Sequence, residues 1–170
     1  VPLAYYIGAY RIKSELEDLS LQYLYPDKYK KLEEVKIKIE NESSNCLKEM
    51  YENINCILNN RDIPHEIKIR TKNIYGIYKR LEQGHKISDI HDLLALKVMV
   101  DDIANCYQTL GLIHSQYHPI NDKFKDYIYN PKTNMYRSLH TTVFGEDNRL
   151  VQTQIRTFDM EYMYIQLREK

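Results

Sequence analysis

Apolar side chains recur at helical spacing over the first third of the chain. They stand three or four positions apart over residues 3–24 and again over residues 27–60, which is the spacing of one buried helical face. Pro26 separates the two stretches, because a proline pushes the residue before it towards extended geometry. The pattern predicts an amphipathic helix or helix pair, then one or two long charged helices interrupted by the polar run NESSN.

Strand-like and helix-like patterns alternate in the middle of the chain. Apolar and polar residues alternate over 66–70, as in a half-buried strand, and helical spacing follows over 73–82. The run LLALKVMV at 93–100 is apolar enough for a central strand. Asp101 and Asp102 follow it directly and can cap the next helix. These features predict two strand-helix units.

A hairpin and a short helix are predicted for the end of the chain. The runs SLHTTVF at 138–144 and LVQTQIR at 150–156 have the composition of strands, and the turn-rich sequence GEDN joins them. A final helix is expected to start near Phe158.

The composition is that of a globular domain, with or without an appendage, because 170 residues can bury a real core. The 24 basic residues balance 24 acidic ones, so any anion site must be local. The three cysteines are odd in number and form no CxxC pair, which predicts reduced thiols in a cytoplasmic protein. No apolar run approaches the roughly 20 residues that span a bilayer, and we expect no membrane partner.

A cluster of basic residues is the first candidate for chemistry. Arg70 and Lys72 lie where the strand 66–70 leads into a helix, and Lys79 and Arg80 lie further along that helix. Backbone amides and the helix dipole favour anions at a helix N-terminus. The alternative is a solvated basic face.

Polar side chains also accompany two of the predicted strands. Asp92 directly precedes the strand 93–100, where a carboxylate is costly unless it caps a turn or holds a cation. Gln152, Gln154 and Arg156 share one face of the last strand, because side chains alternate along a strand. They indicate either a lined cleft or the solvent side of an edge strand.

The stretch KDYIYNPKTNMYRSLHTTV at 125–143 combines cations with aromatic rings. Lysines can bind phosphates, a tyrosine face can stack on a purine, and asparagine can bond a base edge. A strand histidine such as His140 is usually structural, but the nearby Lys132 and Tyr136 favour a functional role. The candidates are Lys123, Lys125, Asp126, Tyr127, Lys132, Asn134, Tyr136, Arg137 and His140. Together, these clusters fit a nucleotide phosphate-transfer site.

The motifs RTKNIYGIYKRL, HDLLALKVMV, FKDYI, NPK, SLHTTV and QIRT follow in order over residues 70–160. This series resembles the synthetase domain of Rel/SpoT-type alarmone enzymes. The resemblance implies an α+β fold similar to the nucleotidyltransferases of the DNA polymerase beta class, a mixed sheet of about five strands flanked by helices. IKSELEDLS resembles the helix that closes the hydrolase domain of long family members. We therefore expect that helix over 1–24, a helical linker over 25–62 and the synthetase domain over 63–170.

The resemblance also implies a reaction, the transfer of pyrophosphate from ATP to the 3′-hydroxyl of GDP or GTP, with Mg²⁺. It implies an upstream hydrolase domain and a ribosome link through C-terminal domains as partners, and no DNA. Arg70 would stack on adenine, and Tyr136 would stack on guanine. The other implied roles are Lys72, Lys79 and Arg80 for ATP phosphates, Lys132, Asn134 and His140 for the guanine nucleotide, Asp92 and Gln152 for the metal, and Asp92, Gln152, Lys125 and His140 for catalysis.

The chain departs from the family pattern at four of these motifs. Gln152 replaces the usual Glu that binds the metal and activates the hydroxyl, and an amide cannot accept that proton. Met135 replaces a Gly, Gly76 replaces a Ser, and Lys123 replaces an Arg; the match fades after Met160. We expect impaired synthesis, with Asp126 as a candidate substitute for the missing Glu.

Two other functions are compatible with the residues. One is a catalytically silent guanine-nucleotide-sensing domain that regulates an attached hydrolase, which Gln152 favours. The other is a single-stranded RNA binder, because basic residues with interleaved tyrosines also serve that role. The zero net charge and the lack of an extended basic stripe argue against RNA.

Overall fold

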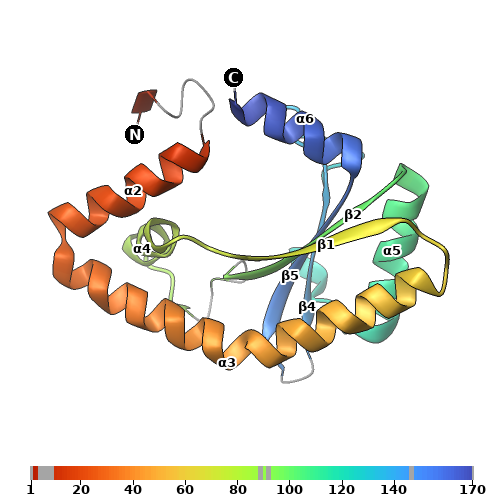
Figure 1. The fold of residues 1–170 in the computed structure, drawn as a ribbon, viewed down its shortest axis with the longest axis horizontal. Helices are drawn as coiled ribbons and strands as arrows, with labels where there is room; N and C mark the ends of the chain where they lie inside the picture. Colours follow the sequence, from red (N-terminus) through yellow and green to blue (C-terminus); the bar gives the residue numbers. More distant parts are fainter. Residues whose placement is uncertain (1, 4–9, 88–89, 91–92, 146–147, 170) are drawn as a thin grey trace.

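A mixed five-stranded sheet forms the centre of the molecule (Figure 1). The computed structural model describes residues 2–3, 10–87, 90, 93–145 and 148–169. The helices are α2 (Tyr10–Leu24), α3 (Pro26–Asn59), α4 (Ile74–Glu82), α5 (Ile103–Gln116) and α6 (Phe158–Glu169). The strands are β1 (His65–Thr71), β2 (Leu94–Val100), β3 (Lys125–Asp126), β4 (Leu139–Phe144) and β5 (Leu150–Thr157).

The strand order is β1-β2-β5-β4-β3. The central strands β2 and β5 run parallel, and every other neighbouring pair is antiparallel. The predicted α+β class, the hairpin and the two strand-helix units are confirmed. Asp102 caps α5 as predicted by accepting a hydrogen bond from the Asn105 backbone N–H at 2.7 Å. The two-residue edge strand β3 is too short to show a period in the sequence.

The apolar core lies between one face of the sheet and the helices α3 and α5. Every second residue of β2 and β5 points into it, as the period of a strand requires. The buried core residues of these four elements are Cys46, Leu47, Met50, Ile54, Leu58, Leu94, Leu96, Val98, Val100, Cys106, Ile113, Val151 and Ile155. Of the three cysteines, Cys46 and Cys106 are buried and Cys56 is exposed.

Helix α3 is continuous through the NESSN run, so of the two predicted alternatives the single long helix is confirmed. The run is polar because it receives the β4–β5 turn. Arg149 donates to the hydroxyl of the buried Ser43 at 3.3 Å, and a Cβ on Gly145 would come within 2.5 Å of Cys46 Sγ. Small and polar residues therefore let the turn approach the helix without ending it.

Helices α2, α3 and α4 form a second, smaller apolar cluster beside the sheet. Its buried members are Leu21, Leu32, Ile74, Ile77 and Ile90. Pro26 is the first residue of α3, and Tyr25 before it is non-helical, with φ −137° and ψ 64°, so the predicted break is confirmed. None of the helices within the described residues is both long and apolar enough to cross a membrane.

We predict that Gly145→Ala lowers the free energy of unfolding by about 1–3 kcal/mol, the usual cost of overpacking. The reason is the 2.5 Å approach of the new Cβ to Cys46 Sγ. Urea denaturation followed by circular dichroism measures the change. Gly111→Ala is the matched control, because nothing lies within 4 Å of its Cβ and α5 gains a better helix former. Equal stability of the native chain and Gly145→Ala would contradict the close approach.

Candidate functional site

Backbone pairing aligns polar side chains across the sheet on the side opposite the core. Lys68 of β1 pairs with Lys97 of β2, and Lys97 pairs with Gln154 of β5. Gln154 also pairs with His140 of β4, which pairs with Lys125 of β3. Directly opposed residues point to the same side of a sheet. These five residues therefore form one row, and we call this side of the sheet the polar face.

A second row of the polar face runs beside the first. Arg70 pairs with Ala95, Ala95 pairs with Gln152, and Gln152 pairs with Thr142. Two strand spacings, about 10 Å, therefore separate the backbones of Arg70 and Gln152. Ala95 between them carries only a methyl group, so the two long polar side chains are the dominant groups of this row.

A basic pocket of about 480 Å³ lies where the end of β1 meets α2 and α4. All four predicted ATP-binding residues line it: Arg70, Lys72, Lys79 and Arg80. The remaining lining residues are Lys13, Ser14 and Glu17 of α2, and Asn73, Tyr75, Gly76 and Gln83. The cationic side chains that line the pocket outnumber its single carboxylate, so the pocket is suitable for an anion.

The backbone amides at the start of α4 are less available than the sequence predicts. Asp18 of α2 accepts hydrogen bonds from the Tyr75 backbone N–H at 2.7 Å and from the Asn73 side chain at 3.3 Å. A carboxylate thus already occupies part of this helix N-terminus. A Cβ at Gly76 would lie 2.6 Å from Asn73 Oδ1 and 3.2 Å from the Lys72 side chain, so the glycine leaves room for both side chains. Phosphates in this pocket would be held mainly by side chains.

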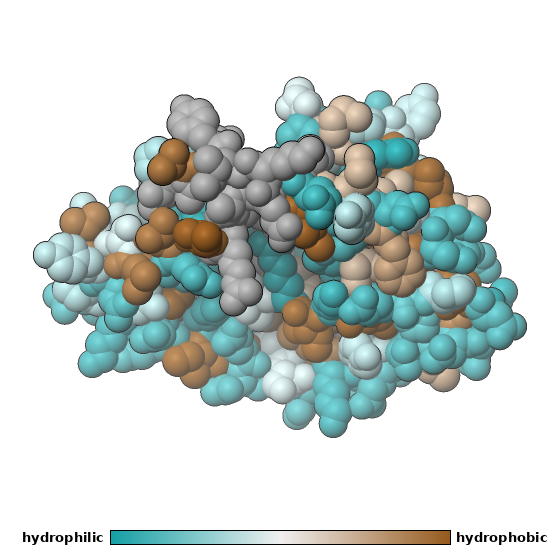
Figure 2. Space-filling model, turned by 45° about the horizontal axis from the view of Figure 1, so that its top comes forward, coloured by the Kyte–Doolittle hydropathy of each residue, from teal (hydrophilic) through white to brown (hydrophobic). Residues whose placement is uncertain are grey.

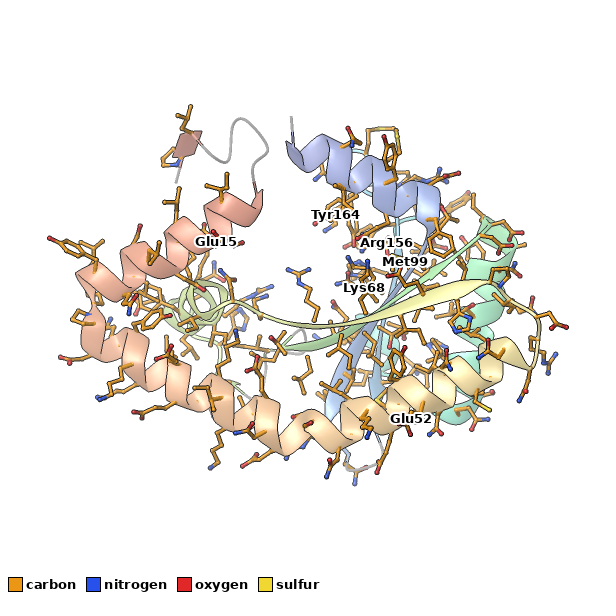
Figure 3. All side chains as sticks on the ribbon, viewed as in Figure 1. Glu15, Glu52, Lys68, Met99, Arg156 and Tyr164 are labelled. Atoms are coloured by element: carbon orange, nitrogen blue, oxygen red, sulfur yellow. The ribbon has the colours of Figure 1, made fainter. Side chains whose placement is uncertain are left out.

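Arg156 lies at the centre of the polar face and is 1% exposed. Its Nη1 donates to Glu161 Oε2 at 2.9 Å, and its Nη2 donates to Gln154 Oε1 at 2.8 Å and to the Tyr136 hydroxyl at 2.6 Å. Figure 3 shows Arg156 of β5 beneath α6, with Tyr164 extending from α6 towards it. The Tyr164 ring centroid lies 5.2 Å from Arg156 Cζ. This buried charge joins β5, α6 and the segment before β4.

Glu161 compensates two cations. Lys97 also donates to it, at 2.5 Å. Burial alone would raise the pKa of Glu161, but the Lys97 hydrogen bond and the nearby Arg156 outweigh burial and lower it. Burial lowers the pKa of Lys97, and Glu161 opposes that shift. Glu161 is therefore ionised at neutral pH. Glu161 is not predictable from the sequence, because nothing in the α6 sequence marks a partner for Arg156.

A chain of amide hydrogen bonds continues from Arg156 towards Gln152. Gln154, which accepts from Arg156, donates through its Nε2 to Gln152 Oε1 at 2.8 Å. Gln154 is 8% exposed, whereas Gln152 is half-buried. We call Arg156, Gln154 and Gln152 the amide chain. The three polar residues that share a face of β5 are thus bonded to one another, and β5 is a central strand rather than an edge strand.

The predicted guanine platform Tyr136 is 8% exposed. Its hydroxyl lies 2.7 Å from His140 Nε2, and burial raises its pKa. Lys132 Nζ lies 5.2 Å from the Tyr136 ring centroid and 4.6 Å from that of Tyr127. Tyr164 contacts Tyr136 edge-on, at 5.0 Å between centroids. Stacking of guanine on Tyr136 stays a prediction, and it requires these neighbours to move aside.

The segment before Tyr136 carries one of the family departures. Met135 has φ 60°, the left-handed conformation that a Gly adopts without strain. The side chain of Asn134 accepts the Tyr136 backbone N–H at 3.3 Å, so it shapes this turn. A second pocket, of about 660 Å³, lies beside it between α5 and α6 and is lined by Met135, Tyr136, Arg137 and Met163 among others. It lies next to the predicted guanine-binding residues.

The edge strand β3 places Lys125 in the row of His140, where its side chain is exposed. Asp126 is engaged locally. Its carboxylate accepts the Tyr107 hydroxyl at 2.8 Å and the backbone N–H groups of Ile128 and Tyr129 at 3.0 and 2.8 Å. These bonds engage both carboxylate oxygens of Asp126.

The predicted metal ligand Asp92 lies outside the described residues. The structure does describe the other predicted metal ligand, Gln152. Its amide oxygen already accepts a hydrogen bond from Gln154. Across the residues that the structure describes, no three histidine, cysteine or acidic side chains gather as a metal site. Magnesium prefers carboxylate and phosphate oxygens. The described residues alone therefore do not fit a resident magnesium ion.

The fold and the polar face define a class of protein. The chain superposes on the small alarmone synthetase 2 of Bacillus subtilis with a TM-score of 0.59 and 23% identity, over 74% of this chain and 78% of that chain. It also resembles the small alarmone synthetase 1 of Bacillus subtilis bound to its product pppGpp, with a TM-score of 0.56 and 22% identity, over 83% of this chain and 74% of that chain. The class is an α+β domain with the fold of the small alarmone synthetases.

Sequence comparison identifies the family. The model described as "Region found in RelA / SpoT proteins" matches residues 69–166, so the chain belongs to the RelA/SpoT family. It is 41% identical to the guanosine-3′,5′-bis(diphosphate) 3′-pyrophosphohydrolase of Aquifex aeolicus, over 94% of this chain and 23% of the relative. It is 38% identical to a GTP pyrophosphokinase of Streptomyces antibioticus, over 94% of this chain and 19% of the relative. The chain thus spans about a fifth of the length of these relatives.

We predict that Glu161→Gln lowers the free energy of unfolding at about pH 7 by roughly 3–5 kcal/mol, because it leaves the buried Arg156 without its counter-ion. The folded pKa of Glu161 is lowered, so its contribution is present above the ordinary glutamate pKa and is lost as pH falls through the folded value. Urea denaturation over a pH series should therefore show the native and variant stabilities converging in acid.

The control for this prediction is Glu82→Gln, which breaks the exposed Lys28–Glu82 pair. Exposed pairs contribute about 0–1 kcal/mol. A Glu161→Gln variant as stable as Glu82→Gln at neutral pH would contradict the central role of the buried pair.

Proposed function

We propose that this domain binds ATP and GDP or GTP across the polar face, and transfers pyrophosphate from ATP to the 3′-hydroxyl of the guanine nucleotide at a low rate. The observation that carries the proposal is the arrangement of one face. The basic pocket lies at its β1 end, the cluster of Lys132, Tyr127, Tyr136 and His140 lies at its β4 end, and Gln152 lies between them. Membership of the RelA/SpoT family supports both substrates.

In the proposed reaction, the 3′-oxygen attacks the β-phosphorus of ATP, the bond to the bridging oxygen of the α-phosphate breaks, and AMP leaves. Charge spreads over the transferred group, so fixed cations supply most of the stabilisation. Lys72, Lys79 and Arg80 would hold the ATP phosphates, with Arg70 stacked on adenine. Mg²⁺ would neutralise phosphate charge when bound, and Asp92 together with the substrate oxygens would hold it.

At the acceptor end, Lys132 and Asn134 would contact the guanine nucleotide. Lys125 and His140, side by side on β3 and β4, would contact its phosphates or the reacting group. The 3′-hydroxyl proton would pass to solvent, because Gln152 cannot accept it and the carboxylate of Asp126 is occupied. Slow transfer follows from this missing proton acceptor. Nucleotide substrates place the reaction in the cytoplasm.

We further propose that the domain works beside a (p)ppGpp hydrolase domain. A similar protein, the bifunctional (p)ppGpp synthase/hydrolase SpoT of Escherichia coli, is 37% identical over 95% of this chain, which covers 23% of that relative. Further domains of such a protein would provide the predicted link to the ribosome. Gln152 favours a second candidate function, a silent domain that senses guanine nucleotides and regulates the hydrolase.

An assay with ATP labelled on the γ-phosphate and unlabelled GDP separates the two functions. Transfer of label to GDP supports synthesis, and tight binding of GDP without transfer supports sensing. Retention of RNA at physiological salt, without affinity for free guanine nucleotides, would contradict both.

We predict that Gln152→Glu raises the rate of transfer by about 10²–10⁴, the usual contribution of a positioned general base. The initial rate of label transfer at saturating ATP and GDP measures the effect. Gln108→Glu, on the exposed side of α5, controls for added charge. A native chain that is fast, with a Gln152→Glu variant that is no faster, would show that this position has another role.

We predict that Lys79→Ala weakens ATP binding by about ten- to a hundredfold, the loss of one charge-assisted hydrogen bond to phosphate. Lys79 lines the basic pocket. Isothermal titration calorimetry measures the affinity. Lys30→Ala removes an exposed charge from α3 and should bind ATP like the native chain. Equal affinities for all three proteins would place ATP elsewhere.

A further inference from the structure

The amide chain has a fixed hydrogen-bond polarity, because a guanidinium group donates but never accepts. Arg156 Nη2 contacts the Gln154 side chain at 2.8 Å, so the Gln154 atom that faces it must be the oxygen. The Gln154 nitrogen then points the other way and donates to Gln152 at 2.8 Å. The atom that receives this bond must in turn be the Gln152 oxygen. Arg156 thereby sets the orientation of both amides.

This polarity decides which atom Gln152 offers to a ligand. Its oxygen is held by Gln154, and within the described part of the chain its nitrogen has no hydrogen-bond partner. A glutamate at this position would accept the same bond from Gln154 with one oxygen and present a second oxygen, which is an acceptor. Gln152 presents an N–H donor instead. The substitution therefore reverses the hydrogen-bonding character of the site and does more than remove a charge.

The groups around Gln152 also suit a hydrogen-bond donor at this position. Gln152 shares a row of the polar face with Arg70, across Ala95, and Arg70 lines the basic pocket. With adenine stacked on Arg70 as proposed, a triphosphate that extends from the pocket over Ala95 would meet the amide donor of Gln152. Donors suit phosphate oxygens, whereas a carboxylate at this position would repel them unless a cation lay between.

We infer that Gln152 is a phosphate-binding residue, and that it lets this site bind a nucleoside triphosphate without a divalent cation. The inference rests on the proposed function for the identity of the ligand, and it deepens that function by assigning the native residue a role of its own. The ligand class is a nucleoside triphosphate whose phosphate chain lies between Arg70 and Gln152.

The test measures ATP affinity by isothermal titration calorimetry, without any guanine nucleotide, in magnesium and in EDTA. The native chain should bind ATP in both. Gln152→Glu should lose about ten- to a hundredfold in EDTA, because it replaces a donor by a like charge, and regain affinity in magnesium. Gln152→Met removes the donor without adding charge, and should lose affinity equally in both conditions.

Gln108→Glu again controls for added charge on a distant surface and should behave like the native chain. Thermal melting checks that each variant is folded. The Gln152→Glu variant keeps the bond from Gln154, so its fold should be unaffected.

A second readout follows the amides themselves. In ¹⁵N-labelled protein, the Gln154 side-chain amide should exchange slowly with solvent because it is buried and bonded. The Gln152 amide should exchange faster and should shift on addition of ATP in EDTA. The Gln152→Met variant identifies its signal by the loss of that signal.

The outcomes separate the two proposals. A native chain that binds ATP only with magnesium, together with a Gln152 amide signal that ATP leaves unchanged, would overturn the role of Gln152 while leaving nucleotide binding intact. Absence of ATP binding in every condition would overturn this inference and the proposed function together. Label transfer to GDP, measured separately, tests the reaction and not the role of the amide.

Discussion

The buried charge of Arg156 is the constraint on which the site depends. A guanidinium that is 1% exposed is destabilising unless hydrogen bonds replace its water. Its partners come from β5 itself, from the segment before β4 and from α6. Its Nε is left without a partner among the described residues. Satisfying this one charge therefore fixes α6 over the sheet, holds Tyr136 in place and orients Gln154 and Gln152.

The apolar core lies on one face of the sheet, and the candidate site lies on the other. The face towards α3 and α5 is apolar and supplies the burial that stabilises the fold. The opposite face is free to carry lysines, amides and a histidine, because the core does not need it. In Figure 2, which turns the top of the molecule forward, hydrophilic residues cover most of the visible surface and apolar ones form small separate groups. A polar face on a rigid sheet is a suitable base for binding charged ligands.

Most of the fold is predictable from the sequence, because its strands and helices have clear periods. The central strand β2, the hairpin of β4 and β5, and the cap at Asp102 follow from local patterns alone. The polar run within helix α3 is harder to interpret from the sequence, because only the distant turn at Gly145, which packs on it, explains it. The two residues of β3 become a strand only through pairing with β4.

The candidate site is predictable in part. Residue types and motif order indicate the basic cluster, and the structure brings its four members to one pocket. The partners of buried groups are not predictable in this way. Lys97 and Arg156 both donate to Glu161 only in the folded chain, and Asp18 meets the start of α4 from another helix. The burial of Tyr136 and the polarity of the amide chain likewise arise from tertiary contacts.

We propose that one face of one sheet binds two nucleotides together. Native mass spectrometry of the chain with ATP and GDP tests this claim most directly, because it counts the ligands on each molecule. The expected result is a species that carries one ATP and one GDP at the same time. Spectra in which each nucleotide displaces the other, or in which neither binds, would contradict it.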